Sequence, residues 1–207
     1  MAILSQSEVE AIARNYYPKM ATAISDAFAD YMELRRVQAA AGVTNFEPRT
    51  CGSMINDIIK TKIKEQIGED ENVIIGDFNQ IFGIVIKGKT GSIFVRFKKF
   101  NDDMTTSNHQ SGQNDDYNNQ GAIPGLEDEP TLLIAGYRPD RSWTNIRNIY
   151  LVCRNGDRVI WQKDLTHEVS QGNLFITPQE QPAQEQETRT GRVTAKKGVS
   201  KTGTDDK

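Results

Sequence analysis

A short turn in the first third of the chain combines one arginine with helix-capping residues. In the run Phe46-Glu-Pro-Arg49-Thr50-Cys-Gly52-Ser53, either Thr50 or Ser53 is suited to cap a following helix. Arg49 would then lie at the positive end of the helix dipole, where a cation is disfavoured unless a negative group is close. Two interpretations follow. Arg49 and the free helix N–H groups bind a phosphate or a partner's carboxylate, or Arg49 forms a structural ion pair with Asp57 or a loop acid.

A second segment interleaves basic and aromatic side chains. It reads Ile-Phe94-Val95-Arg96-Phe97-Lys98-Lys, and strand alternation puts Phe94 and Arg96 on one face, with Val95 and Phe97 on the other. Base stacking combined with phosphate binding requires this composition. The alternative is a solvated basic edge strand, because lysine also protects sheet edges from pairing.

A third segment gathers charge beside two large aromatic residues and reads Gly136-Tyr137-Arg138-Pro-Asp-Arg-Ser-Trp143. Arginine and aromatic residues are enriched at the centres of binding interfaces, so Tyr137 and Arg138 are candidate contacts. Pro-Asp is also typical of a turn, and a turn with a local ion pair explains the same residues.

One enzyme template matches the sequence in part. Metal-dependent nucleases place an acid on a helix, an acid at a strand end, and an acid-x-lysine pair on the next strand. Glu65, Asp77 and Lys87 occupy three of these places, but Val85 stands where the last acid is needed. The chain also contains no GxGxxG, CxxC, HExxH or GxSxG motif. We therefore expect no cofactor and no metal ion, and whether the protein is an enzyme stays open.

Composition excludes several broad classes. The 207 residues include 25 Lys and Arg against 28 Asp and Glu, a net charge of −3, which argues against a histone-like protein. Two cysteines cannot form a disulfide framework, and we expect both to be packed hydrophobes. Because no apolar run is long enough to cross a bilayer and the first residues lack the pattern of a signal peptide, we expect a cytoplasmic protein with no membrane contact.

Hydrophobic periodicity predicts an α+β fold. The first 40 residues have helical spacing, with a break at Pro18 and an end at Gly42, and a second helix is expected over 53–67. The period then changes to two, which predicts a six-stranded, mainly antiparallel sheet. The expected strands are 72–78, 81–87, 92–97, 131–137, 148–154 and 157–163.

Two polar stretches interrupt or follow this pattern. Residues 101–130 contain seven acids and no Lys or Arg, so we expect a long acidic loop, flexible over 103–119 and packed on the body over 120–130. Residues 171–207 are expected to form a disordered tail, because they contain little apolar surface to bury. The predicted organisation is a helical segment over 1–45, a body over 46–170 and this tail.

The pattern of short motifs across residues 45–165 resembles a family of bacterial proteins. The family has an arginine-containing turn before a helix, an RFKK-like strand, a Gln-containing loop and a strand ending in Gly-Tyr. The matching residues here are Phe46, Pro48-Arg49-Thr50, Ser53, Ile55, Asp57, Arg96-Phe97-Lys98-Lys99, Gln120, Pro124-Gly125 and Gly136-Tyr137. Cys51-Gly52 departs from the basic-small pair expected at that turn. Members of the family are encoded beside proteins that join a helix-turn-helix to an ImmA/IrrE-type metallopeptidase domain.

The resemblance implies a function in a paired operon. Such neighbours act as antitoxins in toxin–antitoxin or phage-defence pairs, so this chain is expected to be a toxin-like effector that acts on nucleic acid or nucleotides. The alternative is a non-catalytic interaction module with a degenerate nuclease-like core. We expect Arg49, Arg96 and Lys98 to form one electropositive site. The candidate binding residues are Arg49, Thr50, Ser53, Asp57, Arg96, Lys98, Gln120, Tyr137 and Arg138.

Overall fold

The fold is described by a computed structural model, which covers residues 3–42, 46–106, 112–126 and 129–169. The tail predicted for 171–207 lies outside the described residues. Within them, helices come first and a six-stranded sheet follows, which confirms the predicted α+β class. In the described part of the chain, no helix combines the length and apolar character needed to cross a membrane.

The N-terminal helices begin and end where the sequence signals them. Helix α1 (Gln6–Ala13) starts with a capping box in which Ser5 and Glu8 satisfy each other's backbone N–H groups. A 3₁₀ turn, η1 (Arg14–Tyr16), separates it from α2 (Tyr17–Ala40). Pro18 lies in the first turn of α2, so the predicted break occurs just before it. Gly42 follows the end of α2 with a φ of +82°.

Helix α3 (Pro48–Ile67) starts five residues earlier than predicted. The expected caps are wrong: the N-cap is Glu47, whose side chain makes no capping bond, and Ser53 Oγ donates to the Arg49 carbonyl at 3.0 Å instead. Proline is favoured in the first helical turn because its missing N–H needs no partner there, and Pro48 supplies that start signal. The buried face of α3 follows strict four-residue spacing and consists of Cys51, Ile55, Ile59, Ile63 and Ile67.

The sheet follows chain order from one edge to the other. Its strands are β1 (Val73–Phe78), β2 (Ile81–Gly88), β3 (Gly91–Lys99), β4 (Thr131–Pro139), β5 (Ile146–Asn155) and β6 (Arg158–Asp164). Neighbouring strands are antiparallel, except that β3 and β4 are parallel. A parallel pair cannot be joined by a tight turn, and residues 100–130 supply the crossover.

The acidic segment that forms this crossover is not a uniform loop. Helix α4 (Gly112–Asn118) lies within it, and the side chain of Tyr117 is buried against the ring of Phe94, at a centroid distance of 6.0 Å. The prediction of a long loop over 101–130 is therefore wrong at α4, because burial of this aromatic ring docks the segment on the sheet. Residues 107–111 and 127–128 lie outside the described residues, and the flexibility predicted for 103–119 stays a prediction. Beyond residue 120, the buried Ile123 packs on the body as predicted.

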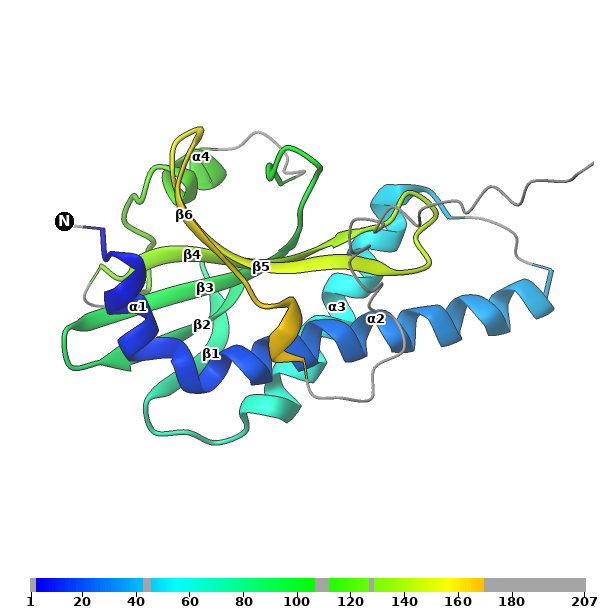
Figure 1. The fold of residues 1–207 in the computed structure, drawn as a ribbon, viewed down its shortest axis with the longest axis horizontal. Helices are drawn as coiled ribbons and strands as arrows, with labels where there is room; N and C mark the ends of the chain where they lie inside the picture. The colour runs from blue at the N-terminus through cyan, green and yellow to red at the C-terminus, as the bar shows by residue number, and fades with distance from the viewer. Residues whose placement is uncertain (1–2, 43–45, 107–111, 127–128, 170–207) are drawn as a thin grey trace, which may run out of the picture.

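Two hydrophobic cores lie on opposite faces of the sheet. Figure 1 shows α2 and α3 on one face and α4 on the other. Val95 and Phe97 face the helical core, whereas Phe94 joins Tyr117 in the smaller core, so the predicted alternation along β3 is confirmed. Cys51 and Cys153 are buried free thiols, as expected. Strand β3 is therefore central and covered on both sides, which excludes the interpretation of a solvated edge strand.

Candidate anion-binding site

A pocket forms where strand β3 extends beyond the end of its ladder with β2. The β2–β3 ladder runs only as far as the pair Gly83–Arg96, whereas β3 continues beside β4 to Lys99. The end of β3 therefore borders open space between the β1–β2 turn and α3. The pocket has a volume of about 680 Å³ and is lined by Pro48, Arg49, Gly52, Ser53, Asn56, Lys60, Gln80, Ile81, Phe82, Arg96, Phe97, Lys98, Lys99, Gln113 and Asn114.

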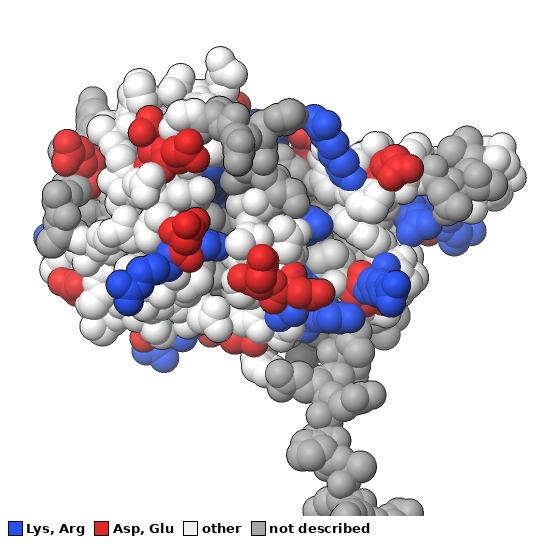
Figure 2. All heavy atoms as spheres, turned by 90° about the horizontal axis from the view of Figure 1, so that it is seen from above, with Lys and Arg blue, Asp and Glu red and all other residues white. Residues whose placement is uncertain are grey.

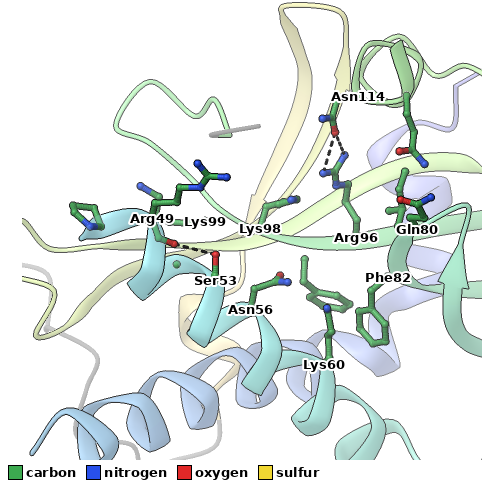
Figure 3. A pocket seen from close by; sticks show the side chains of 15 residues that line it. Arg49, Ser53, Asn56, Lys60, Gln80, Phe82, Arg96, Lys98, Lys99 and Asn114 are labelled. Atoms are coloured by element: carbon green, nitrogen blue, oxygen red, sulfur yellow. Dashed lines mark hydrogen bonds between the residues drawn. The ribbon is translucent and has the colours of Figure 1, made fainter. Parts of the chain in front are cut away.

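The charge of this pocket has one sign. Five cationic side chains line it, from α3 and from the end of β3: Arg49, Lys60, Arg96, Lys98 and Lys99. Among the described residues, no carboxylate lines the pocket. Figure 3 shows these cations approaching from opposite walls, with Lys98 between Arg49 and Arg96. In a chain of net charge −3, this is a local accumulation of positive charge that attracts anions.

Arg96 is held in a defined orientation by α4. Its side chain is only 3 % exposed, and its guanidinium carbon lies 4.5 Å from the centroid of the Tyr117 ring. Both terminal nitrogens donate to Asn114 Oδ1, at 3.3 and 3.4 Å. Stacking on an aromatic face and hydrogen bonds to a neutral amide hold the guanidinium in place. The acidic crossover thus contributes amides to the site, while Asp115 and Asp116 are exposed to solvent.

Lys98 is electrostatically perturbed in the pocket. Partial burial, together with the neighbouring charges of Arg96 and Lys60, lowers the pKa of Lys98 to about 8. The ammonium group is therefore destabilised in the empty pocket and would be stabilised by a bound anion. Within the described ranges, no carboxylate forms a salt bridge with it.

Three further lysines lie beside aromatic rings, and two of them, Lys60 and Lys99, line the pocket. The ammonium groups of Lys60 and Lys64 lie 6.0 and 5.8 Å from the centroid of Phe82. Lys60 also pairs with Asp57 at 3.0 Å on the exposed side of α3. Lys99 lies 5.3 Å from the ring centroid of Trp143. These contacts restrict the long side chains and keep their charge beside the pocket.

The structure brings together four of the nine candidate residues. Arg49, Ser53, Arg96 and Lys98 line the pocket, and their role in binding stays a prediction. Thr50 and Asp57 lie on the exposed surface of α3 and do not line it. The sequence interpretation missed Asn56 and Lys60. The spacing of four, three and four residues from Arg49 through Ser53 and Asn56 to Lys60 puts them on one helix face, a signal that was present in the sequence.

The remaining candidates have structural roles elsewhere. The amide of Gln120 bridges strands: its nitrogen donates to the carbonyls of Leu132 and Arg154 at 2.8 and 2.7 Å, and its oxygen accepts from the Leu132 N–H. Tyr137 is buried in the helical core, 6.0 Å from the ring centroid of Phe28. Arg138 pairs with Asp102 at 2.9 Å.

Charges of opposite sign are intermixed on one face of the molecule. Figure 2 shows this face, on which acidic and basic side chains lie next to one another. Elsewhere, Asp102 lies 2.9 Å from Arg138 and 3.7 Å from Arg147. The face in Figure 2 offers no continuous track for a phosphate backbone.

The structure separates two residues of the nuclease template, Asp77 and Lys87. Asp77 pairs with Phe82 near the β1–β2 turn, whereas the N–H of Lys87 donates to Asn72 at the other end of the hairpin. Glu65 lies beside Lys62 on α3, at 3.6 Å. In the described part of the chain, no group of three His, Cys, Asp or Glu side chains is arranged to hold a metal ion.

One stretch of the sequence has the residue spacing of a phosphate-binding loop but does not fold into one. Residues 83–90 read GIVIKGKT and match the spacing GxxxxGK[ST]. That motif requires a loop between a strand and a helix, whose N–H groups surround the phosphates. Here the residues form β2 and the turn into β3, so their N–H groups belong to a hairpin.

Comparisons of the chain with protein-family models, with curated proteins and with solved structures give no match.

Proposed function

We propose that the protein binds a phosphate-bearing ligand, a nucleotide or a nucleic-acid phosphate, in the basic pocket between α3 and β3. The supporting observation is the set of five cations that line this pocket without a lining carboxylate among the described residues. Lysine and arginine are the side chains that hold phosphate oxygens, and partial burial strengthens each charge-assisted hydrogen bond.

The proposed biological role is that of a toxin-like effector in a bacterial toxin–antitoxin or phage-defence pair. Support for this role comes from the motif resemblance, whose arginine turn and RFKK strand are the two segments that meet at the pocket. The proposed partner is an antitoxin of the helix-turn-helix/metallopeptidase type. An antitoxin that covers the pocket would block ligand binding and neutralise the effector.

A second candidate is a binding module without catalysis. The observation that favours it is the position of Asp77 and Lys87 at opposite ends of the β1–β2 hairpin, which leaves the nuclease template incomplete. In this case the pocket binds its ligand as a signal or a recognition element and leaves it chemically unchanged.

A calorimetric titration with inorganic tripolyphosphate tests the binding step. The variant is Lys98→Glu, and the matched control is Lys87→Glu, which changes the net charge equally at an exposed position outside the pocket. We expect Lys98→Glu to weaken binding roughly 10- to 100-fold, the equivalent of a lost charge-assisted hydrogen bond, and Lys87→Glu to change it less than about threefold. An equal loss of affinity in both variants would show that tripolyphosphate is attracted by the net charge and not bound in the pocket.

Induced expression in bacterial cells tests the effector role. We expect the wild-type chain to arrest growth, co-expression of the neighbouring antitoxin-like protein to restore it, and Lys98→Glu to be harmless at the same protein level. Growth arrest that persists in Lys98→Glu would show that the pocket is not the effector site.

A further inference from the structure

We propose that the ligand of the basic pocket is a free nucleoside polyphosphate, bound with its phosphates along the row of cations and its base against the side-chain amides. This inference deepens the proposed function and rests on it, because it selects the small nucleotide over the nucleic-acid strand.

The dimensions of the pocket favour a small ligand. A volume of about 680 Å³ lies within the range of roughly 300–1,000 Å³ that is typical of pockets for small molecules and cofactors. Proteins that bind single strands present aromatic faces on an open groove, on which successive bases stack. Here the two aromatic rings that line the pocket, Phe82 and Phe97, are buried at 9 % and 3 % exposure.

The distribution of the cations favours more than one phosphate. Figure 3 shows Arg49 and Lys99 at one end of the pocket, Lys98 in the middle and Arg96 at the other end. A chain of phosphates placed along this row can contact more of the cations than a single phosphate can. Because no carboxylate among the described residues lines the pocket, the side chains themselves would neutralise the phosphate charge.

Four amide side chains give the same pocket a means of reading a base. Asn56, Gln80, Gln113 and Asn114 line it, and each amide offers both a donor and an acceptor. Asn114 already accepts from Arg96, and Gln113 donates to the carbonyl of Asn79. Asn56 is half-buried on α3, opposite Lys98 in Figure 3, and within the described residues no hydrogen bond engages its amide. An asparagine with both groups available can pair with the hydrogen-bonding edge of a base.

Titration of a ligand panel tests this inference. The probes are ATP, GTP, CTP and UTP, the four corresponding monophosphates, inorganic tripolyphosphate and a single-stranded RNA of twelve nucleotides. The variants are Asn56→Leu, which keeps the size of the side chain but removes its hydrogen bonds, and Asn148→Leu, a half-buried control on β5 outside the pocket.

We expect at least one nucleoside triphosphate to bind more than tenfold tighter than its monophosphate. Asn56→Leu should weaken that nucleotide about five- to tenfold while leaving tripolyphosphate unchanged, and Asn148→Leu should leave both unchanged. Tripolyphosphate that binds as tightly as every nucleotide, or RNA that binds more tightly than all of them, would overturn this inference while the proposed phosphate binding stands. Failure of every phosphate compound to bind would overturn both.

Discussion

The charge of Lys98 has an electrostatic cost in the pocket. Its ammonium group is partly desolvated and lies near the charges of Arg96 and Lys60, and these effects together lower its pKa to about 8. In the unfolded chain a lysine titrates near 10.4. Between these two values the unfolded state binds more protons, so the contribution of Lys98 to stability rises with pH from about 8 to about 10.4. At neutral pH its charge therefore opposes folding, a cost that a bound polyanion would offset.

Removal of this charge should stabilise the free protein. We expect Lys98→Met to raise the melting temperature at pH 7, by about 2–4 °C for each ~1 kcal/mol recovered in a domain of this size. The gain should shrink at pH 9.5, where wild-type Lys98 is already largely neutral. Scanning calorimetry at both pH values makes the measurement, with Lys87→Met as the exposed control. A lower melting temperature for Lys98→Met at pH 7 would contradict the proposed electrostatic cost.

The same titration predicts how ligand affinity depends on pH. Because Lys98 loses its proton as pH rises through about 8, the affinity for tripolyphosphate should fall between pH 7 and pH 9. Lys98→Arg is the control, since a guanidinium keeps its charge throughout this range. Any change of affinity with pH that remains in this variant comes from titration of the ligand. A steeper decline in wild type than in Lys98→Arg is expected. Parallel profiles would mean that Lys98 does not titrate in the binding step.

Three elements form the site, β3, α3 and α4, and the sequence predicts them with different success. Strand β3 was predicted closely, because the alternation around Phe94 and Arg96 is strict. The start of α3 was placed too late, since Pro48 was not used as a start signal. Helix α4 is not predicted from the sequence, because its seven residues show little helical periodicity. The helix forms where the buried ring of Tyr117 packs on the sheet. The contact of Asn114 with Arg96 depends on that docking, so spacing alone does not reveal it.

The parallel pairing of β3 with β4 fixes the row of cations. Gly136 lies opposite Lys98 in this ladder, and a β-carbon at that position would overlap the Lys98 carbonyl oxygen and lie 2.9 Å from the Phe100 ring. Backbone cannot move aside as a flexible side chain can. The close approach therefore requires glycine at position 136.

Substitution of this glycine should damage both fold and site. We expect Gly136→Ala to lower the free energy of unfolding by about 1–3 kcal/mol, a typical cost of overpacking, and to weaken tripolyphosphate binding. Gly112→Ala is the matched control, because nothing lies within 4 Å of an added β-carbon there. Urea denaturation compares the two variants. Equal stability of Gly136→Ala and wild type would show that β3 and β4 can shift without loss.

At the scale of the whole molecule, the pocket lies where the two layers of the fold meet. One wall belongs to α3, which packs on the helical face of the sheet, and Gln113 and Asn114 come from α4 on the opposite face. The open end of β3 joins them, and the positive charge concentrated there contrasts with a net charge of −3 for the chain. We propose that phosphate binds in this pocket, where the two layers meet.

The most direct test is a crystal structure of the full chain soaked in tungstate, a tetrahedral dianion whose anomalous scattering identifies its position. We predict a tungstate peak inside the pocket, within hydrogen-bond distance of Lys98 Nζ, and loss of that peak in crystals of Lys98→Met. An empty pocket at saturating tungstate, with the anion ordered only at exposed lysines such as Lys87, would contradict the account.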